Sequence, residues 1–185
     1  MQEYGLAAAP HGRIIGLQSY KGVYVGRDIV GYTWYIGPLA QPSPVYFGDG
    51  LAEIERFLWD EIDRQAPGPA ELPFLIGVEQ GAIMALAAAA AVPDLISGVI
   101  AIDGFLPVVP GWTPPLAQLD GLPILLLGSA RNVPPNADVL TDDVLAETFS
   151  SWGGTVEQAA NPTDSVPGEV MADWIGRQAV RTRSG

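Results

Sequence analysis

Glu79 is the residue in this sequence best placed to do chemistry. It lies between Gly77 and Gly81, where an apolar segment typical of a buried strand passes into a segment rich in helix-forming residues. Glycines at such a junction permit a sharp turn that presents the central side chain at the end of the strand. A carboxylate in this position could act as a nucleophile or as a general acid or base.

Few other side chains in the sequence could take part in catalysis. The chain has no cysteine and a single histidine, His11. The lack of cysteine excludes thiolate chemistry and cysteine-based metal sites. Histidine is the usual general base near neutral pH, so any Ser-His-Asp mechanism within this chain must use His11. No base neighbours the remaining candidate hydroxyls, which we interpret as ordinary loop residues: Ser129, Ser151 and Ser165.

Three acidic residues, Asp142, Asp143 and Glu147, share one predicted helix and could imitate a metal site. Acidic side chains near a helix N-terminus are also favoured by the helix dipole. We therefore interpret them as a solvated helix face, and the sequence predicts no metal and no cofactor.

Strand and helix patterns alternate through the C-terminal two-thirds of the chain. Apolar runs of strand length are followed by segments with helical spacing. Repeated strand–helix units form parallel sheets covered by helices. The predicted fold class is therefore α/β, with a mostly parallel sheet, helices on both faces, and a single domain spanning 1–185. The predicted strands are 75–78, 97–102, 122–127 and 155–157, and the predicted helices are 82–92, 138–152 and 169–180.

The N-terminal third is less regular. Residues 4–9 fit a strand, and two aromatic and β-branched runs at 20–25 and 32–36 fit a hairpin. An amphipathic helix is predicted over 51–65, because its apolar residues recur at helical spacing. The loop between hairpin and helix is rich in proline, at Pro38, Pro42 and Pro44.

The composition restricts the partners of the protein. A formal net charge of −12 argues against nucleic acid, because phosphate backbones require a basic surface. The longest apolar run, 82–92, is too short to span a bilayer. The first residues also lack the basic and apolar regions of a signal peptide. We therefore expect a cytoplasmic protein without a membrane span.

Several stretches of the sequence match a known pattern. In order along the chain they are Ala8–His11, Tyr32–Tyr35, Gly77–Ala82, Ser97–Val99 through Gly104–Pro107, Leu125–Gly128 and the closing helix around Trp174. On these stretches the chain resembles the phospholipase/carboxylesterase family, which includes the acyl-protein thioesterases. The resemblance covers nearly the whole chain from about Tyr4 onward. It implies an α/β-hydrolase-like fold, shortened at the N-terminus, in which residues 77–81 form the nucleophile elbow.

The positions of the family's catalytic triad are substituted in this chain. The resemblance places the nucleophilic serine at Glu79 and the catalytic aspartate at Arg131. The catalytic histidine is expected near residues 161–163, which contain none, and His11 aligns with a family histidine that is not catalytic. The strand that supplies part of the family's oxyanion hole would precede the first residue of this sequence. A conventional serine esterase is therefore not expected.

Glu79 and Arg131 come from neighbouring predicted strand ends, and both side chains are long enough to meet. A charge-assisted pair between them would offset the cost of a carboxylate at a half-buried turn. We therefore favour a catalytically inactive domain that serves as a binding or dimerisation module, with a small apolar ligand or a second copy as its partner. The predicted pocket residues are Trp34, Gln80, Phe105, Leu106 and Trp112.

Two alternatives stay open at this stage. Glu79 could act as general acid, base or nucleophile on a small apolar substrate. Carboxylates serve as nucleophiles at the equivalent elbow in the dehalogenase and epoxide-hydrolase branches of the fold. In the third hypothesis, another chain completes a working hydrolase by supplying the missing strand or histidine.

Overall fold

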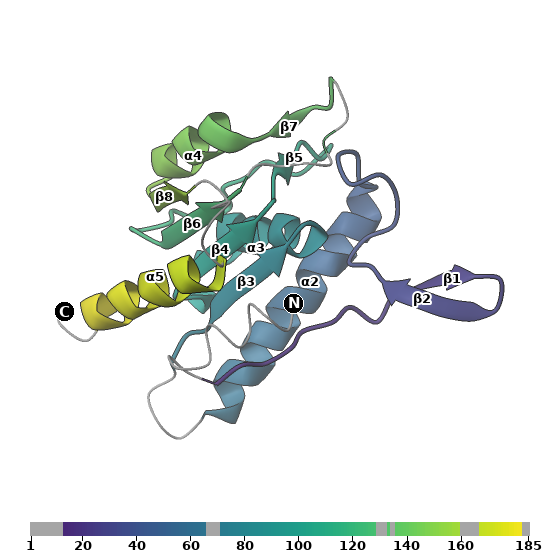
Figure 1. Ribbon diagram of the computed structural model, residues 1–185. Helices are drawn as coiled ribbons and strands as arrows, with labels where there is room; N and C mark the ends of the chain where they lie inside the picture. Colours follow the sequence, from purple (N-terminus) through teal and green to yellow (C-terminus); the bar gives the residue numbers. More distant parts are fainter. Residues whose placement is uncertain (1–12, 66–70, 129–132, 134–135, 160–166, 183–185) are drawn as a thin grey trace.

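A four-stranded parallel sheet lies at the centre of the molecule (Figure 1). The computed structural model describes residues 13–65, 71–128, 133, 136–159 and 167–182. All pairings in this sheet are parallel, and Val78, Ile102 and Leu127 lie level with one another near the carboxyl ends of their strands. The predicted α/β fold class is confirmed. The strands, in spatial order, are β3 (Phe74–Val78), β4 (Gly98–Ile102), β6 (Pro123–Leu127) and β8 (Thr155–Ala159).

The two inner strands are almost completely apolar. Every residue of β4 is buried, and in β6 only Pro123 is partly accessible. Strands of a parallel sheet covered on both faces need apolar side chains on both sides, so they form continuous apolar runs instead of alternating ones. This explains why the sequence pattern located these strands to within a residue or two.

Helices cover both faces of the sheet. On one face, alternate strand residues such as Val99 and Ile124 share a core with α2 (Pro44–Arg64), α3 (Gln80–Ala91) and α4 (Asp142–Ser151). On the other face, the intervening residues pack against α5 (Pro167–Thr182). The side chains of that second core are Ile100, Ile102, Leu125 and Leu127 from the sheet and Met171, Trp174 and Ile175 from α5.

Helix α3 follows the candidate elbow and is buried on every side from Ala82 to Ala90. Alanine has the highest helix propensity, and its small side chain lets the helix lie close to the sheet. A helix that is apolar all round belongs in a protein core. The helix ends at Ala91 and is followed by the short 3-10 helix η2 (Pro93–Leu95).

Helix α2 begins earlier than the sequence predicted. The expected start was Leu51 and the expected loop included Pro44, but the helix starts at Pro44 with Ser43 as its N-cap residue. Proline is well suited to the first turn, because its fixed φ is helical and its missing N–H would have no helical partner there. The proline that signalled a loop thus begins the helix.

The predicted hairpin is present with a different second strand. It consists of β1 (Gly22–Val25) and β2 (Asp28–Tyr32), where residues 32–36 were expected. Gly26 has a φ of 65°, which allows a two-residue turn with Arg27 and brings the chain back sooner. The base is closed by Thr33 N, which donates to Lys21 O at 2.9 Å. In Figure 1 the hairpin extends away from the rest of the molecule.

The predicted helix over 138–152 is shorter than expected. Val139 and Leu140 form the short strand β7, which pairs antiparallel with β5 (Leu106–Pro107), a segment in which no strand was predicted. The helix α4 starts only after Thr141. Both segments follow sheet strands, so their pairing depends on tertiary contact and has no local sequence signal.

The N-terminal segment is held against α2 by two buried carboxylates of that helix. Glu61 forms ion pairs with Arg13 and with Arg64. Glu53 accepts hydrogen bonds from the Lys21 ammonium at 3.1 Å and the Tyr20 amide at 3.2 Å. The path of the chain along the helix is visible in Figure 1. The strand predicted at residues 4–9 lies outside the described residues.

Candidate functional site

Glu79 occupies a sharp turn between β3 and α3. Its φ of 50° and ψ of −112° are strained for a residue with a side chain, and such conformations concentrate at functional sites. The turn is fixed by Glu79 N, which donates to Ile102 O at 3.0 Å, and by Glu79 O, which accepts from Ile83 N at 3.0 Å. The side chain is exposed. This is the geometry that the glycine spacing predicted.

The glycine that precedes the turn has no room for a side chain. A Cβ atom placed on Gly77 would lie 2.2 Å from the backbone oxygen of Gly81. The end of β3 and the first turn of α3 are therefore in van der Waals contact at this position, which only a residue without a side chain permits. Packing of the strand against the first turn of the helix thus determines the direction in which residue 79 points.

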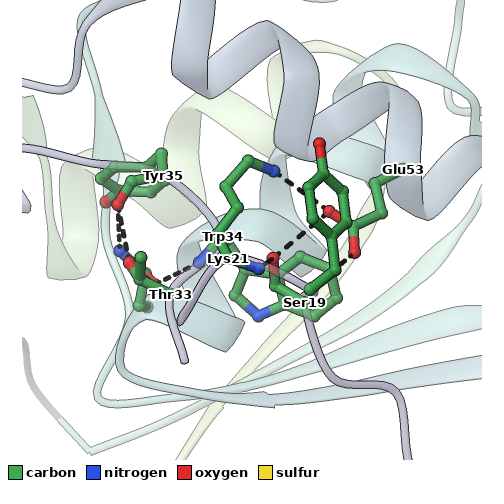
Figure 2. A network of polar contacts seen from close by, with 8 residues as sticks. Ser19, Lys21, Thr33, Trp34, Tyr35 and Glu53 are labelled. Atoms are coloured by element: carbon green, nitrogen blue, oxygen red, sulfur yellow. Dashed lines mark hydrogen bonds and ion pairs between the residues drawn. The ribbon is translucent and has the colours of Figure 1, made fainter. Parts of the chain in front are cut away.

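Gln80 ties the start of α3 to the loop that follows the hairpin. Its Oε1 accepts from Trp34 N at 2.8 Å, and its Nε2 donates to Tyr35 O at 3.2 Å. Thr33 Oγ1 lies 2.9 Å from Gln80 Oε1 and 2.7 Å from Tyr35 O. Figure 2 shows Thr33 and Tyr35 in this network. Gln80 therefore acts as a clamp on residues 33–35, next to Glu79.

Tyr35 anchors the same loop in the core. Its ring is 1% exposed, and its hydroxyl donates to Leu39 O at 2.9 Å. Burial raises the pKa of Tyr35 above its ordinary value, because the charged phenolate would be poorly solvated there. The ring also contacts Phe47, which in turn contacts Trp112, with ring centroids 5.6 Å and 5.2 Å apart. The loop beside the elbow is thus held by an aromatic core.

A second carboxylate, Asp103, lies at the adjacent strand end and was missed by the sequence reasoning. It follows β4 directly, has a φ of 52°, and its amide donates to Leu127 O at 2.9 Å. Because Val78 and Ile102 are level in the sheet, Glu79 and Asp103 leave it at the same edge. The signal in the sequence was the pair Asp103-Gly104 at the end of a buried strand.

The predicted pocket residues do not lie together: some are beside the elbow and others belong to the hydrophobic core. It brings Gln80 into contact with the Trp34 backbone. Phe105 and Leu106 are 2% and 1% exposed and belong to the core. Trp112 is partly buried against that core. Arg131, the predicted partner of Glu79, lies outside the described residues, so the Glu79–Arg131 pair stays a prediction.

A small hollow lies at the carboxyl ends of β4, β6 and β8. Its volume is about 160 Å³, and its lining surface is about half polar and half apolar. Neither Glu79 nor any of the predicted pocket residues is among the described residues that line it, so it opens beside the elbow position rather than at it. The lining residues are Ala101, Gly104, Leu126, Leu127, Gly128, Leu145, Gln158 and Ala159.

The described part of the chain contains no group of three or more histidine, cysteine or acidic residues arranged to hold a metal ion. Within the same residues, no helix is both long enough and apolar enough to cross a membrane.

No protein-family model matches the sequence, and no curated protein is significantly similar to it. Solved structures are similar in fold. The Bacillus cereus carboxylesterase superposes with a TM-score of 0.64 at 15% identity, over 85% of this chain and 73% of that one. The carboxylesterase of Mesorhizobium loti gives 0.62 at 16% identity, over 84% and 73%. This chain shares the α/β-hydrolase fold of these two enzymes.

A third neighbour is the phospholipase/carboxylesterase of Dyadobacter fermentans, with a TM-score of 0.57 at 18% identity, over 78% of this chain and 73% of that one. At identities this low the likeness extends to the fold alone. The resemblance of the sequence to the phospholipase/carboxylesterase family is thus supported by a shared α/β-hydrolase architecture.

Proposed function

We propose that this chain is a carboxylesterase-like domain that does not hydrolyse esters and serves instead as a binding or dimerisation module in the cytoplasm. The observation that supports this most strongly is the elbow. Its glycines, backbone bonds and strained φ are all present, yet it carries the Glu79 carboxylate where a serine hydroxyl would attack an ester.

The scarcity of side chains that could act as a general base agrees with this proposal. A serine nucleophile is activated by a neighbouring histidine, which accepts its proton. The only histidine of this chain is His11, far in sequence from the elbow. A carboxylate nucleophile would form an acyl anhydride with an ester substrate and would also need a base to activate water. Besides Glu79 itself, residues 77–81 contain no group that could act as the base, either for a serine nucleophile or for hydrolysis of an anhydride.

The features that surround the elbow fit ligand binding. The Gln80 clamp holds the loop of Trp34 beside Glu79, and Asp103 adds a second carboxylate at the same edge. We propose a small apolar ligand, because the net charge of −12 disfavours anions.

The test is an ester panel assayed with the wild-type protein and with the Glu79→Gln variant. We expect both proteins to hydrolyse p-nitrophenyl acetate and p-nitrophenyl butyrate no faster than buffer alone. Glu79 is exposed, so the variant should fold normally, which circular dichroism checks. Turnover by the wild type that disappears in Glu79→Gln would contradict the proposal and assign chemistry to the carboxylate.

A further inference from the structure

The β1–β2 hairpin has one exposed aromatic face. In its register Gly22 is opposite Tyr32 and Tyr24 is opposite Ile29, with a register shift between Val23 and Tyr24. Residues directly opposite each other in a ladder share one side of the hairpin. Tyr24, Ile29 and Tyr32, here called the Tyr24 face, are 62%, 50% and 51% exposed. The Tyr24 ring lies over Gly22, where a Cβ atom would be only 3.1 Å from the ring. This proximity of Tyr24 and Gly22 joins the two pairs into one apolar surface open to solvent.

The hairpin receives little support from the rest of the molecule. In the described part of the chain its two strands pair only with each other, which leaves both outer edges without a strand partner. Isolated two-stranded hairpins are marginally stable in water, and exposed apolar surfaces of this kind mark interaction sites. A protein partner that covers the Tyr24 face would stabilise the hairpin.

The charge distribution indicates which partner fits. The hairpin, residues 22–32, contains one basic residue, Arg27, and one acidic residue, Asp28, whereas the chain as a whole has a net charge of −12. The acidic excess therefore lies entirely in the remainder of the chain. Two copies repel each other through these acidic regions and approach with least repulsion through their protruding hairpins.

The tip of the hairpin is complementary to itself. Arg27 and Asp28 are adjacent there, and neither forms an ion pair within the described residues. In a contact with two-fold symmetry, every pair of touching residues occurs twice. If one residue of the first copy touches a second residue of the other copy, the reverse pair forms as well. Each Arg27 can then lie beside the Asp28 of the second copy.

We propose that two copies of this chain associate through the tips of their hairpins, with the Tyr24 faces packed together and the Arg27 and Asp28 charges paired across a two-fold axis. The inference specifies the dimerisation included in the proposed function, and association is measured independently of ester hydrolysis. An interface formed only by two hairpins buries little surface compared with most specific protein contacts. A reversible dimer with a dissociation constant in the micromolar range or weaker is therefore expected.

The first test measures association by sedimentation velocity from about 1 µM to about 1 mM, a range that spans weak complexes. We expect wild-type protein to dimerise reversibly, and the Tyr24→Ser/Ile29→Ser variant to dimerise at least about tenfold more weakly because apolar contact is lost. Tyr46→Ser is the matched control, because Tyr46 is an exposed tyrosine of α2 outside the hairpin. A monomer at all concentrations, or equal effects of the two variants, overturns the proposal.

The second test uses the charges at the tip. Arg27→Asp and Asp28→Arg each give the tip charges of one sign, so each variant alone should dimerise more weakly than wild type. A mixture of the two should associate again, because an acidic tip then meets a basic one. Circular dichroism verifies that both variants fold. Failure of the mixture to associate contradicts the proposed pairing. Wild-type protein that binds anionic vesicles through its hairpin and does not dimerise contradicts it as well.

Discussion

The elbow at Glu79 and the tip of the β1–β2 hairpin are both sharp turns that involve a glycine, but the surroundings of the two glycines differ. A side chain on Gly77 would collide with the backbone of α3, whereas one on Gly26 would meet nothing within 4 Å. The elbow is therefore imposed by packing between a strand and a helix, and the hairpin tip by local chain conformation alone.

This difference separates the architecture of the elbow from its chemistry. The contacts that form the turn involve backbone atoms and Gly77, while the side chain of residue 79 is exposed. Exchange of that side chain alters the chemistry without disturbing the packing. A carboxylate can thus stand at this turn without disturbing the strand and helix that form it.

The largest effect is expected from an alanine scan of the two glycines. Gly77→Ala should lower the free energy of unfolding by at least about 3 kcal/mol, because the contact is with backbone and the turn must open. Gly26→Ala should cost only about 1 kcal/mol, the strain of a positive φ in open space. Urea denaturation measures both. Equal losses would show that the elbow is no more constrained by packing than the hairpin.

A smaller effect is expected from loss of the clamp. Gln80→Ala removes the partners of Trp34 N and Tyr35 O and should cost about 2 kcal/mol, with faster hydrogen exchange at the Trp34 amide. Gln65→Ala is the control, because Gln65 also bonds a loop backbone, at Glu71, but in an exposed place. If the two variants are equally stable, the clamp contributes no more than a surface contact.

The smallest effect concerns Tyr35 and depends on pH. Tyr35→Phe loses the hydrogen bond to Leu39 O and should cost about 1 kcal/mol at neutral pH. The folded-state pKa is raised, so above about pH 10 the unfolded chain releases this proton before the folded one, and wild-type stability falls as pH increases. The difference between the two proteins should therefore shrink above pH 10. A difference that is constant with pH contradicts a buried phenol.

The sequence predicted the elements whose signals are local or strongly apolar. The runs of β4 and β6 and the alanine-rich α3 were located closely, because burial on all sides leaves one pattern of residues. The elbow was located by the spacing of Gly77 and Gly81 between such a strand and such a helix. These features follow from composition within a short window.

The features that the sequence analysis missed depend on contacts between distant segments. The pairing of β5 with β7 and the position of Asp103 beside Glu79 both follow from strand order, which no local pattern encodes. The early start of α2 was missed because the local signal is ambiguous. Pro44 fits a loop and a first helical turn equally well. The Gln80 clamp was likewise hidden, since its partners precede it by 45 residues or more.

The most direct test of an intact elbow without a nucleophile is intact-mass spectrometry after exposure of the wild-type protein to a fluorophosphonate. Such reagents form a covalent adduct with the activated serine of esterases. We predict that the mass stays that of the unmodified chain while an active carboxylesterase treated in parallel is fully labelled. A stoichiometric adduct on the wild-type chain would contradict the account, because it would reveal an activated nucleophile that Glu79 does not replace.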